Sequence, residues 1–478
     1  MAHNKKILLI YPPTTIFKEK ERKRIGFPLG LAYIAAVLEQ NGYLVRCVDA
    51  TAEDSENEIT INNDQISFGL TPEKIKKIIN NYKPQYVGIS VLYSCQAANG
   101  HMICSVAKAV SKEIITIMGG AYPTSDPERA LSDENLDFVV NGEGEKTIIE
   151  LLDAIRLKKD RNNTRGISYR ENGCVKINPA PSLIEDLDSL PFPARHLFDF
   201  NAYSNTKYAH GTFKQSPVAS IITSRGCPFN CSFCFTIKMA GTKFRVRSVE
   251  NIISETRYLI DKYQIKELHF EDDNFLFDKK RAENLFDEMI RLKFNLSWTT
   301  PNGLAVNNLD RDILVIMKRS GMYSLIIAAE SGNPRVLKEI LRKPIKLEKV
   351  EEVVKILKEI KVPAQIYWMI GLPGETKEEM EDTIKLAEKL NAINPNVYSS
   401  FSCYTPFKGT KLFEICKNKK LINEEKDIRD FKYCKSTLDT EEFTHDYVTE
   451  LRKIAWQRAN NIESDEDLRR NEKLNIWI

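Results

Sequence analysis

The sequence predicts an α/β protein with a doubly wound parallel sheet at the N-terminus, a six-unit β/α partial barrel after it, and a helical C-terminal region. Short apolar runs alternate with amphipathic stretches in two separate series, and a charged, polar stretch separates the series. The expected boundaries are 1–155 for the first domain, 156–215 for a connector, 216–412 for the barrel and 413–478 for the C-terminal region.

The first series contains apolar runs that we expect to form buried strands, with a helix after most of them. The expected strands span 6–11, 44–48, 86–92, 114–118 and 138–140. The expected helices span 29–40, 71–82, 99–111 and 146–155. Strands that alternate with helices form parallel sheets covered on both faces, and such sheets bind ligands beyond the carboxyl ends of their strands.

The connector is expected to contain a hairpin around Asn172-Gly173 and a proline-stiffened linker segment at 190–197. The second series has expected strands at 218–223, 267–270, 296–300, 324–328, 364–370 and 397–403. The expected helices span 249–263, 279–292, 310–319, 334–341, 347–360, 375–390 and, beyond the barrel, 443–461. A β/α barrel carries out its chemistry at the carboxyl ends of its strands.

Composition and charge exclude several classes of function. The 42% of hydrophobic residues suffice for buried cores, and a formal net charge of +3 with both signs interspersed gives no footprint for nucleic acid or a membrane surface. No signal peptide or membrane span is visible, so we expect a cytoplasmic protein. The ten cysteines favour a reducing compartment, and Cys403, Cys416 and Cys434 are expected to be free thiols rather than ligands of an auxiliary cluster.

The segment 221–234 carries the strongest chemical signal. An apolar run ending in Arg-Gly is followed by Cys227, Cys231 and Cys234 in a loop that contains glycine, proline and asparagine. Three thiolates without a nearby fourth ligand leave one iron of a 4Fe-4S cluster open to a small molecule, whereas a structural zinc site needs four ligands. The pattern favours the open cluster, and the alternative is zinc or unrelated buried thiols.

With its flanks, this segment resembles the radical S-adenosylmethionine enzymes, whose cluster is held by Cys-x3-Cys-x2-Cys with an aromatic residue just before the last cysteine. Phe233 is that aromatic residue here. The resemblance implies that S-adenosylmethionine chelates the open iron and is cleaved by electron transfer to a 5'-deoxyadenosyl radical. It also implies an electron donor such as flavodoxin or ferredoxin.

Polar residues follow the second and third barrel strands. Glu271 and Asp272 could accept hydrogen bonds from the ammonium group of S-adenosylmethionine, as an acidic residue at this rim does in the resembling family. A turn after the third strand could present Asn302 to the same rim. Taken singly, each strand end could instead be ordinary capping or turn chemistry.

The fourth and fifth barrel strands end in similar signatures. Glu330 and Ser331 resemble the contacts that the family makes to the ribose and carboxylate of S-adenosylmethionine. Gly371 lies in a glycine-containing turn, which would let the adenine approach backbone groups. Polar or glycine-containing residues at successive strand ends after the cysteine loop favour a cofactor site at the rim of the barrel.

Elements of the first domain resemble the cobalamin-binding domains found in part of this family. Ser90 and Leu92 match a Ser-x-Leu element, and Gly119-Gly120 match a Gly-Gly element that lines the channel for the nucleotide tail of cobalamin. A Gly-Gly pair is also common in other doubly wound folds. Gly142 fits either the same class or the start of a helix.

The family's histidine element is absent after the first strand, where the sequence runs Tyr11-Pro12-Pro13-Thr14-Thr15. This absence implies either cobalamin without a protein imidazole on cobalt or a domain that has lost the cofactor.

The resemblance covers about residues 5–415 and implies an enzyme that uses a 4Fe-4S cluster, S-adenosylmethionine and cobalamin to methylate an unreactive carbon of a small molecule, lipid or peptide. A second hypothesis within the class is ring closure, ring contraction or another rearrangement without methyl transfer. A third is a non-enzymatic iron-sulfur or corrinoid sensor, which would not need acidic and glycine residues at every strand end. We expect no nucleic-acid partner.

Overall fold

Residues 5–18, 23–204, 213–422 and 432–462 are described by the computed structural model, whose internal contacts divide the chain into two units. Of the described residues, unit 1 contains 5–18, 23–204 and 235–241. Unit 2 contains the described residues 213–234, 242–422 and 432–462. The finer domain boundaries expected from the sequence remain predictions.

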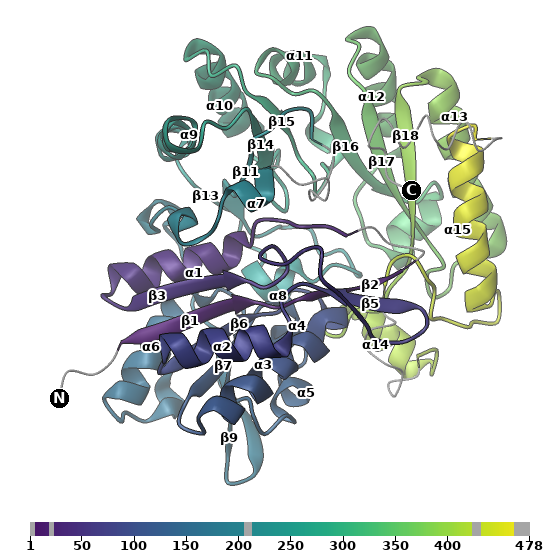
Figure 1. The fold of residues 1–478 in the computed structure, drawn as a ribbon. Coiled ribbons are helices and arrows are strands. Elements are labelled where there is room, and N and C mark those ends of the chain that lie inside the picture. The colour runs from purple at the N-terminus through teal and green to yellow at the C-terminus, as the bar shows by residue number, and fades with distance from the viewer. Residues whose placement is uncertain (1–4, 19–22, 205–212, 423–431, 463–478) are drawn as a thin grey trace. The chain divides into compact units, whose positions relative to one another are not determined.

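Unit 1 is built on a seven-stranded sheet in the order β10-β9-β8-β7-β6-β1-β3 (Figure 1). Its strands are β1 (Lys6–Tyr11), β3 (Leu44–Asp49), β6 (Tyr86–Ser90), β7 (Ile115–Gly119), β8 (Phe138–Val140), β9 (Ile167–Glu171) and β10 (Cys174–Ile177). The five neighbouring strands β3, β1, β6, β7 and β8 run parallel to one another. The strand order reverses between β1 and β6, which is the point where such sheets bind ligands.

Helices cover both faces of this sheet. Ile7 and Leu9 of β1 pack on one face with α1 and α6, and Leu8 and Ile10 pack on the other face with α2 and α3, because successive side chains of a strand point to opposite faces. The helices of unit 1 are α1 (Leu29–Gln40), α2 (Pro72–Tyr82), α3 (Ala97–Val110), α4 (Ala121–Ser125), α5 (Pro127–Leu131), α6 (Gly144–Arg156), α7 (Asn201–Ser204) and α8 (Thr236–Ala240). The predicted doubly wound sheet is confirmed.

The hairpin predicted in the connector is confirmed, and it extends the sheet. Asn172 and Gly173 have φ angles of 52° and 80°, as a tight turn between two strands requires. β9 pairs antiparallel with β8, so the hairpin forms the edge of the sheet. The segment expected to be a linker also packs on unit 1, since Ala194 N donates to Ala32 O at 3.0 Å.

A small antiparallel sheet was not expected from the sequence. It contains β2 (Thr14–Phe17), β5 (Gln65–Phe68) and β4 (Glu58–Thr60). Its strands are short, and β4 is exposed along its whole length, so no apolar periodicity marks it.

Unit 2 contains two three-stranded parallel sheets, in the orders β11-β14-β15 and β16-β17-β18 (Figure 1). The strands are β11 (Val218–Ile221), β14 (Glu267–Phe270), β15 (Ser297–Thr299), β16 (Leu325–Glu330), β17 (Ala364–Ile370) and β18 (Val397–Cys403). Single parallel bridges, Trp298 to Met322 and Leu304 to Ile327, join the sheets. These six strands form the predicted partial barrel, and a two-stranded ribbon of β12 (Ser224–Arg225) and β13 (Arg245–Val246) precedes α9.

The helices of unit 2 are α9 (Val249–Tyr263), α10 (Lys279–Arg291), α11 (Arg311–Arg319), α12 (Leu347–Glu359), α13 (Lys377–Ile393), α14 (Lys411–Asn418) and α15 (His445–Ala459). The helix expected at 334–341 is instead a short π-helical turn at Val336–Ile340. The C-terminal helix α15 packs on β18, where Arg452 Nε donates to Phe401 O at 2.9 Å.

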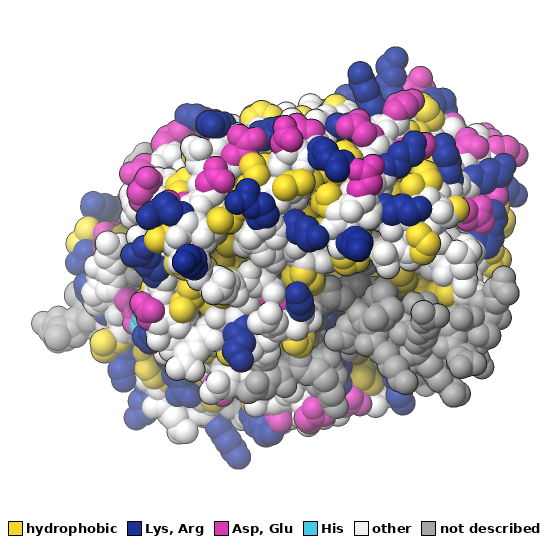
Figure 2. Space-filling model, turned by 90° about the horizontal axis from the view of Figure 1, so that it is seen from above, with side chains coloured by type: hydrophobic (Ala, Val, Ile, Leu, Met, Phe, Trp, Pro, Cys, Tyr) yellow, Lys and Arg dark blue, Asp and Glu magenta, His cyan; other side chains and the backbone are white. Residues whose placement is uncertain are grey.

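Short 3-10 turns connect the larger elements, at Ser94–Gln96, Arg161–Asn163, Leu187–Ser189, Arg195–Leu197 and Val306–Asn308. In the part of the chain that the structure describes, no helix is long and apolar enough to cross a membrane. On the face drawn in Figure 2, Lys and Arg side chains are interspersed with Asp and Glu side chains, in line with the small net charge of +3.

Candidate active site

The three-cysteine loop follows β11 and β12 at the carboxyl end of the first barrel strand, and other parts of unit 2 hold its middle. Ser232 N donates to Leu341 O at 2.9 Å, and Ser232 O accepts from Leu412 N at 3.0 Å. These bonds attach the loop to the segment after the π-helical turn and to the start of α14. The path of the cysteine loop is therefore fixed by segments far away in sequence.

The thiols of the loop form an electrostatically coupled set. Burial, with a smaller contribution from Cys234, raises the pKa of Cys227 and raises that of Cys231 to about 12. Among the described residues no three His, Cys, Asp or Glu side chains are close enough to hold a single metal ion. Each thiolate of a 4Fe-4S cluster binds a different iron, so this donor set fits a cluster, which would displace the thiol protons.

Two side chains that the sequence interpretation missed lie beside the thiols. Asn274 Nδ2 donates to Cys227 Sγ at 3.6 Å, and the ammonium of Lys343 lowers the pKa of Cys231. Lys343 Nζ also lies 5.8 Å from the ring centroid of Phe233. Asn274 belongs to the polar run after β14 and could have been chosen there, but no periodicity or motif marks Lys343.

Glu330 ends β16 in a strained conformation. Its φ is +68°, in the left-handed region, and the pairing of β16 with β17 shifts register just before it. Its carboxylate accepts from Lys343 Nζ at 2.7 Å, and its charge raises the pKa of Cys231. The structure thus brings Glu330, Lys343, Phe233 and Cys231 together.

The hydroxyl of Ser331, the next residue, is turned toward α13. It lies 3.2 Å from Thr383 Oγ1 and accepts from Asn333 N, also at 3.2 Å. Ser331 is fully buried, so these contacts favour a role in anchoring the end of β16. Its predicted contact with S-adenosylmethionine stays a prediction.

The acidic residues after β14 have different surroundings. Asp272 is buried, and its carboxylate accepts from Thr223 N at 3.1 Å and from Thr223 Oγ1 at 2.7 Å. Burial raises the pKa of Asp272, although Arg281 opposes the shift. This carboxylate ties β14 to the segment that leads into the cysteine loop, which favours a positioning role over a contact with the cofactor.

Glu271 and Asn302 lie together at the rim. Asn302 Nδ2 donates to Glu271 O at 2.9 Å, and Glu271 Oε1 accepts from Ser220 Oγ at 3.1 Å. Glu271 is only partly buried, so its carboxylate can still accept further hydrogen bonds. Of the two acidic residues predicted here, Glu271 has the less buried carboxylate, and its contact with the ammonium group of S-adenosylmethionine stays a prediction.

Gly371 is required by packing within unit 2. Its φ is +77°, and a Cβ at this position would lie 2.6 Å from Cγ1 of Val448 on α15. Its N–H donates to Glu375 Oε2 at 2.8 Å. Glu375 is fully buried, its Oε1 has no hydrogen-bond partner, and burial raises its pKa to about 8.

In unit 1 the two predicted cobalamin elements are neighbours. Ser90 pairs with Gly119 across β6 and β7, and Val91 N donates to Gly119 O at 2.8 Å. Gly120 has φ +108°, and a Cβ there would lie 2.4 Å from Val91 O, so backbone packing alone requires a glycine. At Gly119 a Cβ would make an ordinary van der Waals contact, 3.7 Å from Val140 O, so packing does not require a glycine at this position.

Apolar side chains are exposed at the same edge of the sheet. Leu92 is 43% exposed and Tyr93 is 52% exposed. Leu92 and Tyr93 thus expose apolar surface next to the ends of β6 and β7, and the predicted contacts of Ser90, Leu92, Gly119 and Gly120 with cobalamin stay predictions. Gly142 has φ +65° and donates its N–H to Thr124 Oγ1 at 3.0 Å, and α6 begins at Gly144, so the segment leads into a helix. The role of Gly142 in a cobalamin site stays a prediction.

The histidines described in unit 1 are both engaged. His101 Nδ1 lies 2.9 Å from Asp133 Oδ2, and its Nε2 lies 3.0 Å from Tyr122 Oη. His196 pairs with Glu39 at 3.1 Å. After β1, where the family's histidine would stand, the chain instead enters β2.

Comparison with known proteins agrees with this arrangement. Residues 221–387 match the radical SAM superfamily and residues 20–152 match the B12 binding domain. The chain is 33% identical to the cytidylyl-2-hydroxyethylphosphonate methyltransferase of Streptomyces wedmorensis, over 88% of this chain and 84% of the relative. It is 35% identical to an uncharacterized methyltransferase of Pyrococcus horikoshii, over 86% of this chain and 82% of the relative.

Among solved structures, the fold is similar to the radical S-adenosylmethionine methyltransferase TsrM from Kitasatospora setae, which was determined with cobalamin and a [4Fe-4S] cluster bound. The TM-score is 0.68 at 18% identity, covering 88% of this chain and 79% of TsrM. Fold and cysteine loop together define a radical S-adenosylmethionine enzyme that has a B12-binding domain. The chain belongs to the cobalamin-dependent radical SAM methyltransferase family.

Proposed function

We propose that this enzyme methylates an unactivated carbon of a small molecule. The observation that carries the proposal is the coupled set of three thiols at the barrel rim, with Glu271 and the Glu330–Lys343 pair at neighbouring strand ends. Cys227, Cys231 and Cys234 would hold the cluster, and the edge of the sheet at Gly119 would receive cobalamin. When bound, the cluster supplies the electron that cleaves S-adenosylmethionine, and cobalamin supplies the methyl carrier.

The residues of the chain position and shield these groups. Asp272 fixes the segment before the cysteine loop, and Ser232 fixes its middle. Glu271 would accept hydrogen bonds from the ammonium of S-adenosylmethionine. The ammonium group of Lys343 would interact with the carboxylate of S-adenosylmethionine or with the cluster thiolates. Such fixed donors and acceptors need little reorganisation when the cofactor binds.

A small molecule is the substrate class with the best support, since the name of the Streptomyces wedmorensis relative gives cytidylyl-2-hydroxyethylphosphonate as its substrate. The net charge of +3, with both signs interspersed, gives no support for a nucleic-acid substrate. The reducing electron would come from outside the chain, from a flavodoxin or a ferredoxin. None of the ten cysteines is in a disulfide, which supports the cytoplasm as the working compartment.

The test is anaerobic incubation of the reconstituted enzyme with methyl-deuterated S-adenosylmethionine, cobalamin, a reductant and a metabolite extract. Mass spectrometry should detect a product that carries the labelled methyl group together with 5'-deoxyadenosine. Deoxyadenosine without a labelled product would favour the rearrangement hypothesis, and the absence of both would favour a sensor. Cys231→Ala should abolish both signals, whereas the variant of the exposed Cys174, Cys174→Ala, should keep them.

A further inference from the structure

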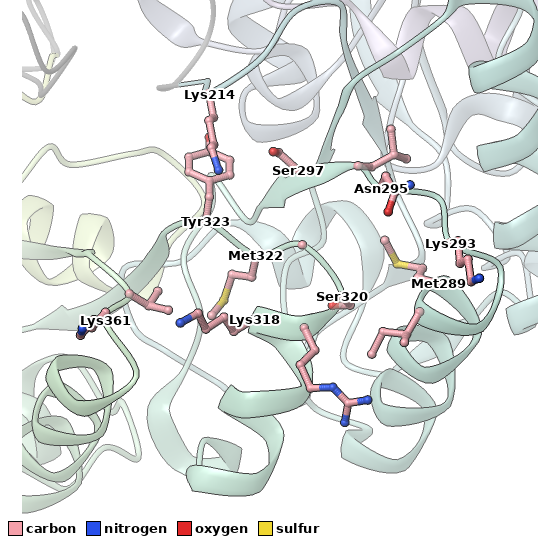
Figure 3. A pocket seen from close by; sticks show the side chains of 15 residues that line it. Lys214, Met289, Lys293, Asn295, Ser297, Lys318, Ser320, Met322, Tyr323 and Lys361 are labelled. Carbon is pink, nitrogen blue, oxygen red and sulfur yellow. The ribbon is translucent and has the colours of Figure 1, made fainter.

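Unit 2 contains a cavity at the amino-terminal ends of β15, β16 and β17, the end of the barrel strands opposite to the cysteine loop. Its volume is about 610 Å³, and the loops that precede these three strands form its walls (Figure 3). A cavity of this size suits a ligand as large as a nucleotide. None of the residues discussed at the candidate active site lines it, so it has no part in the chemistry proposed above.

Basic side chains surround this cavity without acidic partners. The basic residues that line it are Lys214, Lys293, Lys318, Arg319 and Lys361, and no Asp or Glu is among the lining residues. Within the described chain none of these five forms an ion pair, and Lys318 Nζ donates only to Ile360 O, at 2.6 Å. Basic residues elsewhere in unit 2 do find carboxylates, as Lys279 does with Asp310 and Lys389 with Glu351.

The positions of these cations at helix ends explain only part of this pattern. A cation near a helix C-terminus is favoured by the helix dipole, and α10, α11 and α12 all end at the cavity. Lys293 and Lys361 each lie two residues beyond a helix, with a φ of 53°. Lys158 and Lys420 occupy the same left-handed position after α6 and α14, but they do not line the cavity. The dipole accounts for single cations and not for their convergence around an empty space.

The remaining walls are apolar or carry neutral polar groups. In Figure 3, Met289 and Met322 lie between Lys293 on one side and Lys318 and Lys361 on the other. Neutral polar side chains are contributed by Asn295, Ser297, Ser320 and Tyr323.

The backbone of the cavity wall is fixed in place. Gly321 has φ +116°, and a Cβ there would lie 2.0 Å from Leu296 O, so two of the wall loops are packed directly together. The hydroxyl of Tyr323 is held by Glu267 at 2.8 Å. The cavity is therefore preformed. We call Met289 and Met322 its apolar, or methionine, floor, and we call the five basic residues its cationic rim.

We propose that this cavity binds a phosphorylated small molecule of nucleotide size, with its phosphates at the cationic rim and its uncharged body on the methionine floor. Several cations that converge without counterions repel one another, and an anion bound among them removes this repulsion. A concave site with an apolar floor suits a small molecule better than the flat acidic surface of a protein. Because the rim is exposed to solvent, binding should weaken as salt rises.

The experiment measures the binding of ADP, pyrophosphate and adenosine to the full-length protein by calorimetry, with S-adenosylmethionine saturating so that its own site is filled. ADP should bind more tightly than pyrophosphate, because only ADP also covers the apolar floor, and adenosine should not bind. The double variant Lys293→Gln/Lys361→Gln should weaken ADP binding by about tenfold or more while leaving S-adenosylmethionine cleavage unchanged.

The matched control is Lys158→Gln/Lys420→Gln, which removes two lysines from the same left-handed positions outside the cavity and should bind ADP like the wild type. Equal ADP affinity in both double variants would overturn the proposal, as would a wild-type protein that binds no probe. Equal affinity for ADP and pyrophosphate would overturn the assignment of the methionine floor to the ligand body. Binding of an acidic protein such as flavodoxin, lost in Lys293→Gln/Lys361→Gln while ADP does not bind, would replace the small molecule by a protein partner.

Discussion

Lys343 Nζ lies 2.7 Å from Glu330 Oε1, in an ion pair whose side chains are 10% and 12% exposed. The pair lies between Phe233 and the end of β16, and both charges act on the thiol of Cys231, Lys343 lowering its pKa and Glu330 raising it. A nearly buried pair of this kind is costly to break, since the remaining charge loses its partner.

Lys343→Met should therefore destabilise the protein by about 3 kcal/mol, because it leaves the carboxylate of Glu330 without a counterion. The double variant Lys343→Met/Glu330→Gln should recover most of this loss. Denaturant unfolding under anaerobic conditions measures both. If the pair serves the cofactor as well as the fold, the double variant should be stable and still cleave S-adenosylmethionine at least about tenfold more slowly than the wild type. Normal cleavage in the double variant would limit the pair to a structural role.

Replacing any one of Cys227, Cys231 and Cys234 by alanine should abolish the 4Fe-4S cluster, because each thiolate is one of only three anchors. Iron and sulfide content, the absorbance of the cluster and deoxyadenosine formation are the measurements. Cys174→Ala is the control, since this exposed cysteine lies in the hairpin strand β10. A Cys231→Ala protein with an intact cluster would contradict the assignment.

Gly119→Val should lose cobalamin binding, whereas Gly120→Val should lose stability. A Cβ at Gly119 would meet no atom closer than 3.7 Å, so Gly119→Val should fold and yet fill the space proposed for the nucleotide tail. Gly120→Val places a β-branched residue at φ +108° against Val91 O and should destabilise unit 1 by at least about 2 kcal/mol. Thermal unfolding and the cobalamin content after reconstitution distinguish the two. Normal cobalamin binding by Gly119→Val would show that the nucleotide tail of cobalamin does not occupy the space at Gly119.

Cob(II)alamin bound to the enzyme should give an electron paramagnetic resonance spectrum without superhyperfine splitting from a protein imidazole. The reason is that both ring nitrogens of His101 are engaged, by Asp133 and by Tyr122. His101→Gln should leave the spectrum unchanged. Nitrogen splitting that disappears in this variant would show that His101 leaves its partners to reach cobalt.

Glu375 should make stability depend on pH. Burial raises its pKa from 4.5 to about 8, so between these values the folded state keeps a proton that the unfolded state has lost. The free energy of unfolding should therefore fall as pH rises from about 5 to 8. Glu375→Gln resembles the protonated acid and should remove this fall, which unfolding curves recorded at several pH values would reveal. An unchanged pH dependence in Glu375→Gln would assign the effect to other groups.

The sequence predicted the elements that have strong local periodicity. The strands Lys6–Tyr11, Glu267–Phe270 and Val397–Cys403 were predicted with the bounds that the structure shows, because each is an apolar or alternating run between turn residues. The three cysteines could be found for the same reason, since their spacing within one loop is itself the chemical signal. Short, polar or exposed elements such as β4 carry no such signal, and the sequence did not reveal them.

The tertiary structure decided which polar residues face one another and which glycines are needed for packing. Lys343 meets Glu330 only because the segment after the π-helical turn returns to the end of β16, and Asp272 is buried because Thr223 lies opposite it. The contact of Gly371 with the adenine stays a prediction, but Val448, which is distant in sequence, already requires a glycine there. Local sequence sets propensity and periodicity, whereas burial, pKa shifts and ion pairs depend on residues distant in sequence that folding brings together.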